Sequence, residues 1–380
     1  MSLNLEPFKR VAIIGTGGIA RVHARVVREL GGVLVAVCGR EKGSAVRFGI
    51  GEPYDDFGLL LREQRPDVVH ICTPNHLHRE QALMAFAAGA HVLCEKPMAT
   101  NGDDAQEMCD AADKAGRIGG IAYCYRGYPA VPLIKSRVAA GTYGVLRRVA
   151  GEYLSQDVFA ADKYVWHFTP GTVGEAFALM DYGVHWFDLV EYVSGQSISE
   201  ITAQFSTHQR RRTWSGLTGE GPRPEGEELA GGLVGVEFGL EDQADLLIRL
   251  SGGAAGAAVI SAVSPGNPND IVLSADGTLA GFDWRQQDPN VYIERRPDGV
   301  TTRQRSPDEL PEGYRWMTST PAGHAEGYVD AFRNVVRQCW SAMQGGTNEY
   351  PGFRDGLRGV RLVEAAVESA HRRKPVDTSV

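Results

Sequence analysis

The sequence predicts an α/β protein with an N-terminal Rossmann-type, doubly wound parallel sheet, followed by an α/β domain with an open, mostly antiparallel sheet. The chain has 380 residues, more than the roughly 250–300 at which one hydrophobic core stops growing. Short apolar runs alternate with helical patterns in the first third, whereas later runs follow one another with few helices between them. We therefore expect two domains, residues 1–125 and 126–380.

In the first domain, each expected strand is apolar on both faces, which is typical of a parallel sheet covered on both sides. The expected strands are 11–14, 33–38, 68–72, 91–94 and 120–124. The helical patterns between them cover 19–30, 42–48, 57–63, 76–88 and 103–114.

In the second domain, consecutive strands separated by turn signals indicate an antiparallel sheet. Strands are expected at 148–153, 198–207, 233–238, 244–250, 256–263, 271–274 and 280–284, and helices at 178–193, 324–343 and 354–372. Segment 209–231 is rich in Gly, Pro, Arg and Glu, has no periodicity, and is expected to be a long loop and a candidate lid.

Composition excludes several classes of function. The net charge is −8, and the single local basic cluster, Arg210 to Arg212, is expected to be a solvated loop, so a nucleic-acid partner is not indicated. No apolar stretch approaches the roughly 20 residues that cross a bilayer, so no membrane association is expected. Six cysteines without zinc spacing, four of them ending apolar runs, favour buried thiols, no metal site and a reducing cytoplasm.

A glycine-rich turn follows the first strand and leads into a helix. Its residues, ending at Ala20 in the pattern G-x-G-x-x-A, are Gly15, Thr16, Gly17, Gly18 and Ile19. The glycines allow a tight turn and close approach of a pyrophosphate, which the helix N-terminus can bind through free N–H groups. In this α/β context the turn predicts a dinucleotide cofactor.

The end of the second strand bears on which dinucleotide binds. An acid usually holds the ribose 2′-hydroxyl of NAD there, but that position reads Gly39. Arg40 could pair with the 2′-phosphate of NADP. The alternative is that Arg40 is a surface residue and Glu41 holds the ribose. The sequence favours NADP and leaves NAD possible.

Two further patterns can carry chemistry. Glu95-Lys96-Pro97 follows the strand 91–94, where ligands of a parallel sheet bind, and a cis bond before Pro97 is one way to fix the turn. Asp181 and His185 lie four apart on an expected helix, so they share a face in an otherwise apolar stretch. The alternatives are a surface lysine and an Asp–His pair that satisfies itself in the core. An Asp/His metal site including Asp188 is a minor possibility.

Taken together, these motifs resemble the Gfo/Idh/MocA oxidoreductase family, which includes glucose–fructose oxidoreductase and inositol dehydrogenases. The matching stretches span most of the chain: 15–20, 73–78, 88–97, 125–129, 181–188 and 355–358. The resemblance implies that Lys96, Asp181 and His185 surround the reacting carbinol. It also implies that Thr73, Pro74, Asn75 and His78 lie near the nicotinamide or its ribose, with Glu95 and Lys96 at the cofactor, and that the open sheet forms the interface of a homodimer or homotetramer.

The resemblance implies an NAD(P)-dependent oxidoreductase that transfers hydride between its cofactor and a secondary alcohol or ketone of a sugar, polyol or sugar derivative. Alternatives are a reductase of a non-sugar carbonyl, imine or dihydrodiol, or a silent cofactor-sensing regulator. The stretch 177–180 departs from the glycines of many relatives and leaves the substrate open. Candidate substrate-binding residues, several of which are equally compatible with core, capping or ion-pair roles, are Tyr123, Arg126, Tyr153, Gln156, Trp166 and His324.

Overall fold

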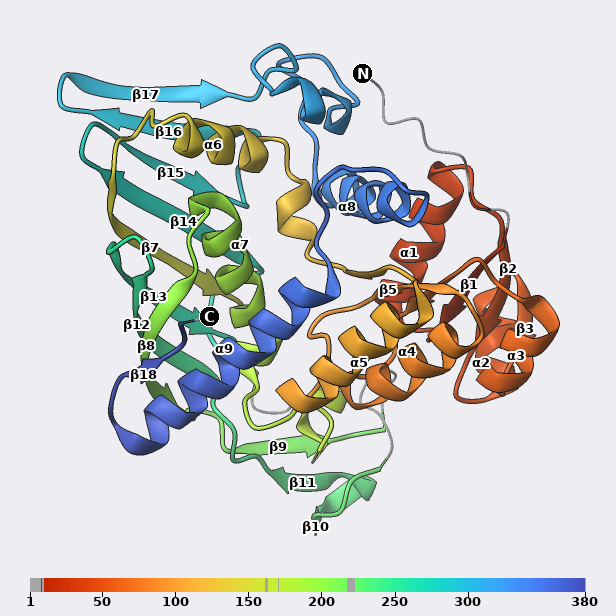
Figure 1. The fold of residues 1–380 in the computed structure, drawn as a ribbon. Coiled ribbons are helices and arrows are strands. Elements are labelled where there is room, and N and C mark those ends of the chain that lie inside the picture. The colour runs from red at the N-terminus through yellow and green to blue at the C-terminus, as the bar shows by residue number, and fades with distance from the viewer. Residues whose placement is uncertain (1–7, 9, 161–162, 170, 217–222, 380) are drawn as a thin grey trace. The chain divides into compact units, whose positions relative to one another are not determined.

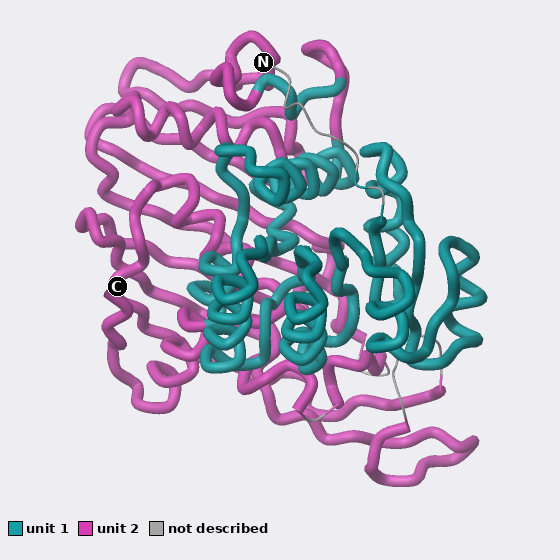
Figure 2. Tube along the Cα trace, turned by 45° about the vertical axis from the view of Figure 1, so that its right-hand side comes forward, with its two compact units in different colours: residues 1–127, 315–319, 327–360 teal, residues 128–314, 320–326, 361–380 magenta. Residues whose placement is uncertain are grey.

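The computed structural model describes residues 8, 10–160, 163–169, 171–216 and 223–379. They form two compact units, coloured separately in Figure 2. The first unit contains residues 1–127, 315–319 and 327–360, and the second contains 128–314, 320–326 and 361–380. The chain thus returns to the first unit late in the sequence. Segments 315–319 and 327–360 belong to the first unit, whereas the expected division at residue 125 assigned them to the second domain.

The first unit is built on a parallel sheet, whose order among the described residues is β3-β2-β1-β4-β5-β6 (Figure 1). The strands are β1 Val11–Ile14, β2 Leu34–Cys38, β3 Glu52–Tyr54, β4 Val68–Ile71, β5 His91–Cys94 and β6 Gly119–Ile121. The helices are α1 Gly18–Glu29, α2 Lys42–Phe48, α3 Phe57–Gln64, α4 His78–Ala87 and α5 Gly102–Ala115. This strand order is that of a dinucleotide-binding Rossmann fold, as expected.

The sequence analysis missed β3. It contains only three residues, Pro53 among them, and pairs with β2 at the sheet edge. Proline is tolerated at such an edge because its missing N–H does not interrupt a central ladder. So short a run has too few residues to show a period.

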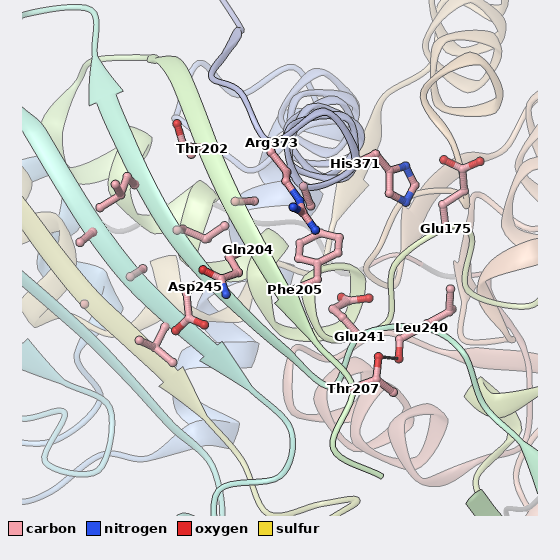
Figure 3. Close-up of a pocket in the computed structure, with 18 of the residues that line it drawn as sticks. Glu175, Thr202, Gln204, Phe205, Thr207, Leu240, Glu241, Asp245, His371 and Arg373 are labelled. Carbon is pink, nitrogen blue, oxygen red and sulfur yellow. Dashed lines mark hydrogen bonds between the residues drawn. The ribbon is translucent and has the colours of Figure 1, made fainter. Parts of the chain in front are cut away.

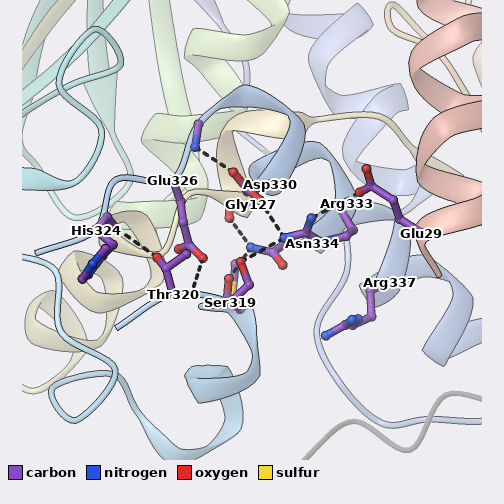
Figure 4. A network of polar contacts seen from close by, with 12 residues as sticks. Glu29, Gly127, Ser319, Thr320, His324, Glu326, Asp330, Arg333, Asn334 and Arg337 are labelled. Carbon is purple, nitrogen blue, oxygen red and sulfur yellow. Dashed lines mark hydrogen bonds and ion pairs between the residues drawn. The ribbon is translucent and has the colours of Figure 1, made fainter. Parts of the chain in front are cut away.

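Helix α8, Tyr328–Met343, completes the first unit. The side-chain amide of Asn334 donates to the carbonyls of Gly127 (3.0 Å) and Met317 (2.7 Å), and Arg333 pairs with both Glu29 (3.2 Å) and Asp330 (2.7 Å), as Figure 4 shows. These contacts attach a late segment of the chain to the sheet domain. The expected helix 324–343 therefore begins four residues later, and His324 lies in the exposed loop before it.

The second unit is built on an open sheet with the order β17-β16-β15-β14-β7-β13-β12-β8-β18 among the described residues (Figure 1). Its strands are β7 Leu146–Leu154, β8 Ile198–Ser206, β12 Gln243–Leu250, β13 Ala255–Ser261, β14 Asp270–Gly277, β15 Gly281–Arg285, β16 Val291–Arg296, β17 Gly299–Gln304 and β18 Val376–Asp377. Neighbours are antiparallel except for the parallel pair β7 and β13. The expected mostly antiparallel sheet is confirmed.

Helices α6, Ala130–Ala139, and α7, Val184–Ser194, pack on each other, and α7 lies against β7 and β14 (Figure 1). Helix α9, Phe353–Arg372, agrees with the expected 354–372. The analysis missed α6, β16 and β17. Polar residues fill both faces of β17, which runs Gly-Val-Thr-Thr-Arg-Gln. Such a strand has no alternation of apolar residues to detect.

The expectation of an unstructured loop at 209–231 was wrong for part of the segment. Strands β9, Arg211–Trp214, and β10, Glu227–Glu228, pair with β11, Val234–Glu237, in a separate antiparallel sheet, while residues 217–222 lie outside the described residues. Arg212 was expected in a solvated loop but is fully buried. Its guanidinium donates to the carbonyls of Val158 and Ala160 and covers the ring of Phe168.

All six cysteines are free and buried, as the positions at strand ends suggested for four of them. Burial raises the pKa of Cys38 and of Cys109 to about 11. In the described parts of the chain, no helix is both long and apolar enough to span a bilayer.

Candidate active site

The glycine turn of the first unit leaves room for a phosphate group. Gly15 has φ +111°, and a Cβ there would lie 2.4 Å from the carbonyl oxygen of Cys72, so only glycine fits. Around Gly17 and Gly18, by contrast, a Cβ would meet nothing within 4 Å. Gly17 caps α1 without a side-chain hydrogen bond, and the first turn of α1 holds no acidic residue. The N–H groups at this helix start therefore fit the pyrophosphate of a dinucleotide.

The end of β2 is closed to the acid that would hold a ribose hydroxyl. A Cβ on Gly39 would lie 2.2 Å from the hydroxyl oxygen of Ser44. Glu41 pairs with Arg47 at 3.0 Å and caps α2. The guanidinium of Arg40 is exposed, and within the described residues no side chain pairs with it. The arrangement leaves Arg40 available to an anionic ligand.

The Glu95-Lys96-Pro97 turn follows β5, and its Lys96–Pro97 peptide bond is cis, as the sequence suggested. Lys96 is half-buried, and its backbone N–H donates to Glu95 Oε2 at 3.2 Å. Glu95 is only 7% exposed. The turn therefore presents a lysine at the carboxyl end of the sheet on a backbone that a buried carboxylate holds.

The stretch after β4 is fastened to the same turn. The imidazole of His78 is fully buried and lies 2.9 Å from the carbonyl oxygen of Pro97 through Nδ1 and 2.8 Å from that of Thr73 through Nε2. Thr73 donates its hydroxyl to Gln81 at 2.6 Å. His78 thus connects the two turns that we expect to line the nicotinamide, and both of its ring nitrogens face the protein. Asn75 is buried, and Pro74 is half-buried.

Two predicted substrate residues of the first unit are buried. Tyr123 is 1% and Arg126 5% exposed. The guanidinium of Arg126 pairs with Asp355 at 2.9 Å. The ion pair gives Arg126 the structural role that the sequence left as its alternative, and substrate contact by either residue stays a prediction.

In the second unit, Asp181 lies in a π-helical turn, Leu179–Gly183, that leads directly into α7. Asp181 is half-buried, and His185 in the first turn of α7 is 4% exposed. Between them, a Cβ on Gly183 would lie 2.7 Å from Leu179 Cδ2, so any larger residue would require the Leu179 side chain to move. Short π-helical turns are frequent at functional sites, and this one carries Asp181 and leads directly into the first turn of α7, which carries His185.

Aromatic side chains surround this pair. The ring of Tyr153 lies 6.2 Å from that of His185 and 5.1 Å from that of Tyr182. The Tyr182 hydroxyl donates to Asp157 at 3.3 Å. Burial, aided by the charges of Asp181 and Asp157, raises the pKa of Tyr182 well above its usual value, so Tyr182 stays a neutral phenol.

Segment 166–168 reaches the same residues. His167 Nε2 lies 3.9 Å from Asp181 Oδ2, and the His167 ring stacks on Trp166 at 3.7 Å. Gln156 is exposed, and its side-chain oxygen accepts the N–H of Gly266. The structure therefore places Tyr153 next to His185 and His167 next to Asp181 in the second unit, and it places Gln156 and His324 in exposed loops.

The sequence analysis missed Glu241, which lies before β12. Its carboxylate accepts the N–H groups of Phe177 (2.8 Å) and Leu179 (2.9 Å) at the start of the π-helical turn. Burial raises the pKa of Glu241 to about 7, although the accepted N–H groups act in the opposite direction. The adjacent acids Glu241 and Asp242 at the start of an apolar strand were a signal that could have singled out this position.

A cavity of about 1150 Å³ lies elsewhere in the second unit, on the open sheet (Figure 3). Its polar lining includes Glu175, Gln204, Asp245, His371 and Arg373. None of the residues predicted for catalysis, cofactor or substrate lines it. Glu241 does line it, so this part of the sheet surface adjoins the residue that accepts the N–H groups of the π-helical turn.

Comparison with known proteins places this geometry in a family. Residues 9–123 match the oxidoreductase family with an NAD-binding Rossmann fold, and residues 132–281 match the GFO/IDH/MocA C-terminal domain. The chain is 30% identical over 349 residues to levoglucosan dehydrogenase of Pseudarthrobacter phenanthrenivorans, covering 88% of this chain and 85% of that one.

Solved structures agree along the whole chain. Levoglucosan dehydrogenase in complex with NADH and levoglucosan aligns with a TM-score of 0.85 and 25% identity over 98% of this chain and 100% of the other. An inositol dehydrogenase homolog of Azotobacter vinelandii with NADH and myo-inositol gives 0.82 and 25% over 99% of both. The chain belongs to the Gfo/Idh/MocA family of oxidoreductases, and its residues 9–123 are that family's NAD-binding Rossmann fold.

Proposed function

We propose that this oxidoreductase interconverts a secondary alcohol and a ketone on a sugar, a polyol or a sugar derivative. The observation that carries the proposal is the π-helical turn with Asp181 and the start of α7 with His185, next to the rings of His167 and Tyr153. Aromatic faces and a few convergent polar groups suit the ring and hydroxyls of a carbohydrate. Levoglucosan and myo-inositol, the ligands of two similar structures, are both polyhydroxylated rings.

The mechanism follows from the chemistry of the side chains. The bound nicotinamide supplies the acceptor for hydride. An imidazole nitrogen of His185 takes the proton of the substrate hydroxyl, because the pKa of histidine lies near neutrality. The ammonium of Lys96 donates a hydrogen bond to the same oxygen and stabilises its developing negative charge. Asp181 orients the substrate or the imidazole. The same groups protonate a carbonyl in the reverse direction.

Positioning of the substrate falls to residues around that pair. Tyr153, Trp166 and His167 supply ring faces, and Gln156 supplies an amide in a loop of the same unit. His324 lies in an exposed loop. It can bind the substrate only if that loop forms part of the substrate site. Exchange of Trp166 for leucine would raise the KM for the sugar more than it lowers kcat if this assignment holds.

We further propose that NADP is preferred to NAD. Gly39 cannot carry the usual acid without displacing Ser44, Glu41 is committed to Arg47, and the Arg40 guanidinium is available for a 2′-phosphate. The NADH complexes of the relatives belong to those proteins and leave NAD as the alternative. The Arg40→Asp variant is expected to shift the ratio of kcat/KM for NADP over NAD towards NAD, and an unchanged ratio would reject the role of Arg40.

The open sheet is proposed as the interface of a homodimer or homotetramer in a cytoplasmic enzyme. Its outward residues include Leu247, which is 61% exposed on β12. Exposed apolar side chains on a sheet face favour association. Light scattering should give a multiple of 41.2 kDa, and Leu247→Glu should lower that mass.

The first experiment is a fluorescence titration with NADPH and NADH, followed by a panel of sugars, polyols and dihydrodiols with the better cofactor. Turnover of a sugar or polyol supports the proposal, and turnover of dihydrodiols alone would replace its substrate class. Tight cofactor binding without any turnover would instead support a cofactor-sensing regulator.

A further inference from the structure

A line of polar side chains crosses the buried core of the first unit and ends at the Glu95-Lys96-Pro97 turn. It starts at Trp340 in α8, passes through His70 in β4 and His23 in α1, and reaches Glu95 after β5. Trp340, His70 and His23 are all 0% exposed. Four elements far apart in sequence each contribute one member.

The contacts are continuous. Trp340 Nε1 lies 3.2 Å from His70 Nε2, the two Nδ1 atoms of His70 and His23 lie 2.9 Å apart, and His23 Nε2 lies 2.9 Å from Glu95 Oε1. The other carboxylate oxygen of Glu95 accepts the backbone N–H of Lys96. Every ring nitrogen of both histidines is thus used inside the core.

The indole sets the direction of every bond in this line. An indole N–H can only donate, so His70 Nε2 must accept. Burial and the neighbouring His23 lower the pKa of His70 well below its usual value, so His70 is neutral and carries its proton on Nδ1. His23 then accepts at Nδ1 and donates from Nε2 to Glu95. The opposite direction of these hydrogen bonds is excluded, because it would place a proton on His70 Nε2 facing the indole N–H of Trp340.

Because the hydrogen bonds run in this direction, Glu95 must accept from His23. Both of its oxygens face N–H groups, one from His23 and one from the Lys96 backbone, so the carboxylate is the form that satisfies both donors. A polar line in a core is costly compared with apolar packing, and one whose members satisfy only each other would add little stability. This line instead terminates on the residue that holds the backbone of Lys96.

We propose that Trp340, His70 and His23 are positioning residues that hold Glu95 as an acceptor-only carboxylate and thereby fix Lys96 for catalysis. The proposal rests on the proposed role of Lys96 in the reaction. His23 is the decisive member, because it alone contacts both its neighbour in the line and Glu95.

The first test reads the tautomers directly. Proton–nitrogen correlation spectra of the full-length enzyme with labelled histidine, recorded at neutral pH with NADP⁺ present, report which ring nitrogen of each histidine carries a proton. We expect Nδ1–H for His70 and Nε2–H for His23, assigned by the loss of signals in single variants. The opposite tautomers, or a doubly protonated His70 or His23, would overturn the directed line whatever the enzyme's activity.

The second test separates positioning from stability. His23→Leu removes both hydrogen bonds, and His23→Gln keeps an amide N–H that can donate to Glu95. The control is Phe332→Leu, which removes a buried ring packed 4.8 Å from the His23 ring without removing a hydrogen bond. All are compared at temperatures well below their unfolding midpoints.

We expect His23→Leu to lower kcat by roughly 10- to 100-fold, the cost of a small displacement of a catalytic group, with little change in the Kd of NADPH. His23→Gln should recover part of that loss, and Phe332→Leu should keep kcat even if it lowers the unfolding midpoint as far. A His23→Leu enzyme as active as Phe332→Leu would overturn the positioning role.

Failure of the proposed function gives a different result. In that case the wild-type enzyme turns over no sugar or polyol, or Lys96→Met keeps full turnover. The tautomer measurement still decides whether the line is directed as described, and the kcat comparison decides the positioning role only against an active wild type.

Discussion

The two segments that carry the proposed chemistry are held in different ways. In the first unit, the Glu95-Lys96-Pro97 turn depends on a buried glutamate that side chains of other elements reach from afar. In the second, the turn with Asp181 depends on the buried Glu241, which accepts backbone N–H groups of that same turn. The first arrangement is sensitive to remote side chains, whereas the second is sensitive to one carboxylate alone.

The largest expected effect is on turnover and applies to the reacting residues of both units. His185→Ala should lower kcat by roughly 10²- to 10⁴-fold, because it removes the proton acceptor. Lys96→Met should lower it by roughly 10²- to 10³-fold. Steady-state kinetics with the best sugar measures both. The Kd of NADPH should be unchanged in His185→Ala, and undiminished turnover would remove that histidine from the mechanism.

The next effect concerns the hydrogen bonds between Glu241 and the turn that carries Asp181. Glu241→Ala leaves two buried N–H groups without their acceptor, and we expect it to lower the free energy of unfolding by about 2–4 kcal/mol. Urea denaturation measures the change. Glu175→Ala, an exposed glutamate on the same cavity, is the control and should stay close to wild type. An equal loss of unfolding free energy in the two variants would contradict the stabilising role of the Glu241 hydrogen bonds.

The same carboxyl predicts a pH dependence of stability. Its pKa is about 7 in the folded protein and near 4.5 when unfolded, so the folded state binds the proton more tightly. This contribution is complete below about pH 4.5 and is lost as pH rises through about 7, by at most roughly 3 kcal/mol. Glu241→Gln should flatten that part of the stability profile, whereas Glu175→Gln should not. Parallel profiles for wild type and Glu241→Gln would show that Glu241 is ionised throughout.

The smallest effect is expected for the buried Tyr182, which lies in the π-helical turn itself. Tyr182→Phe removes one 3.3 Å hydrogen bond to Asp157 and should cost about 0.5–1 kcal/mol of unfolding free energy. Because the ring contact with Tyr153 survives, kcat should change little. A large fall in kcat would instead place the Tyr182 hydroxyl at the substrate.

Sequence patterns predicted the parts of this protein that local rules determine. The glycine turn and the lysine after β5 each need only a strand and its next few residues. The expected regular helix over 178–193 instead begins with the π-helical turn at Asp181, so the spacing of Asp181 and His185 does not by itself place them on one face. The fold class followed from runs such as 11–14 and 68–72, whose burial on both faces is visible in their composition.

Contacts between distant residues escaped the same reasoning. Glu241 meets its partners across 62 and 64 positions, and no period or motif encodes such a pairing. In the sequence, Arg212 resembles a surface residue, because its contacts with backbone carbonyls and with the ring of Phe168 exist only in the folded chain. The hydrogen bond between His23 of α1 and His70 of β4 likewise depends on packing between distant parts of the chain.

The contact at Gly39 constrains how cofactor preference could evolve. The Cβ of an aspartate there would lie 2.2 Å from Ser44 Oγ, so a lone Gly39→Asp change would force the Ser44 hydroxyl away from the Glu41 carbonyl to which it donates. A change of Ser44 to alanine or glycine would remove the nearest of these contacts and leave the 3.1 Å approaches to the Ala45 nitrogen and the Glu41 carbonyl oxygen. Directed evolution towards NAD through position 39 should therefore also select changes at position 44, and the two positions should show epistasis in a combinatorial library.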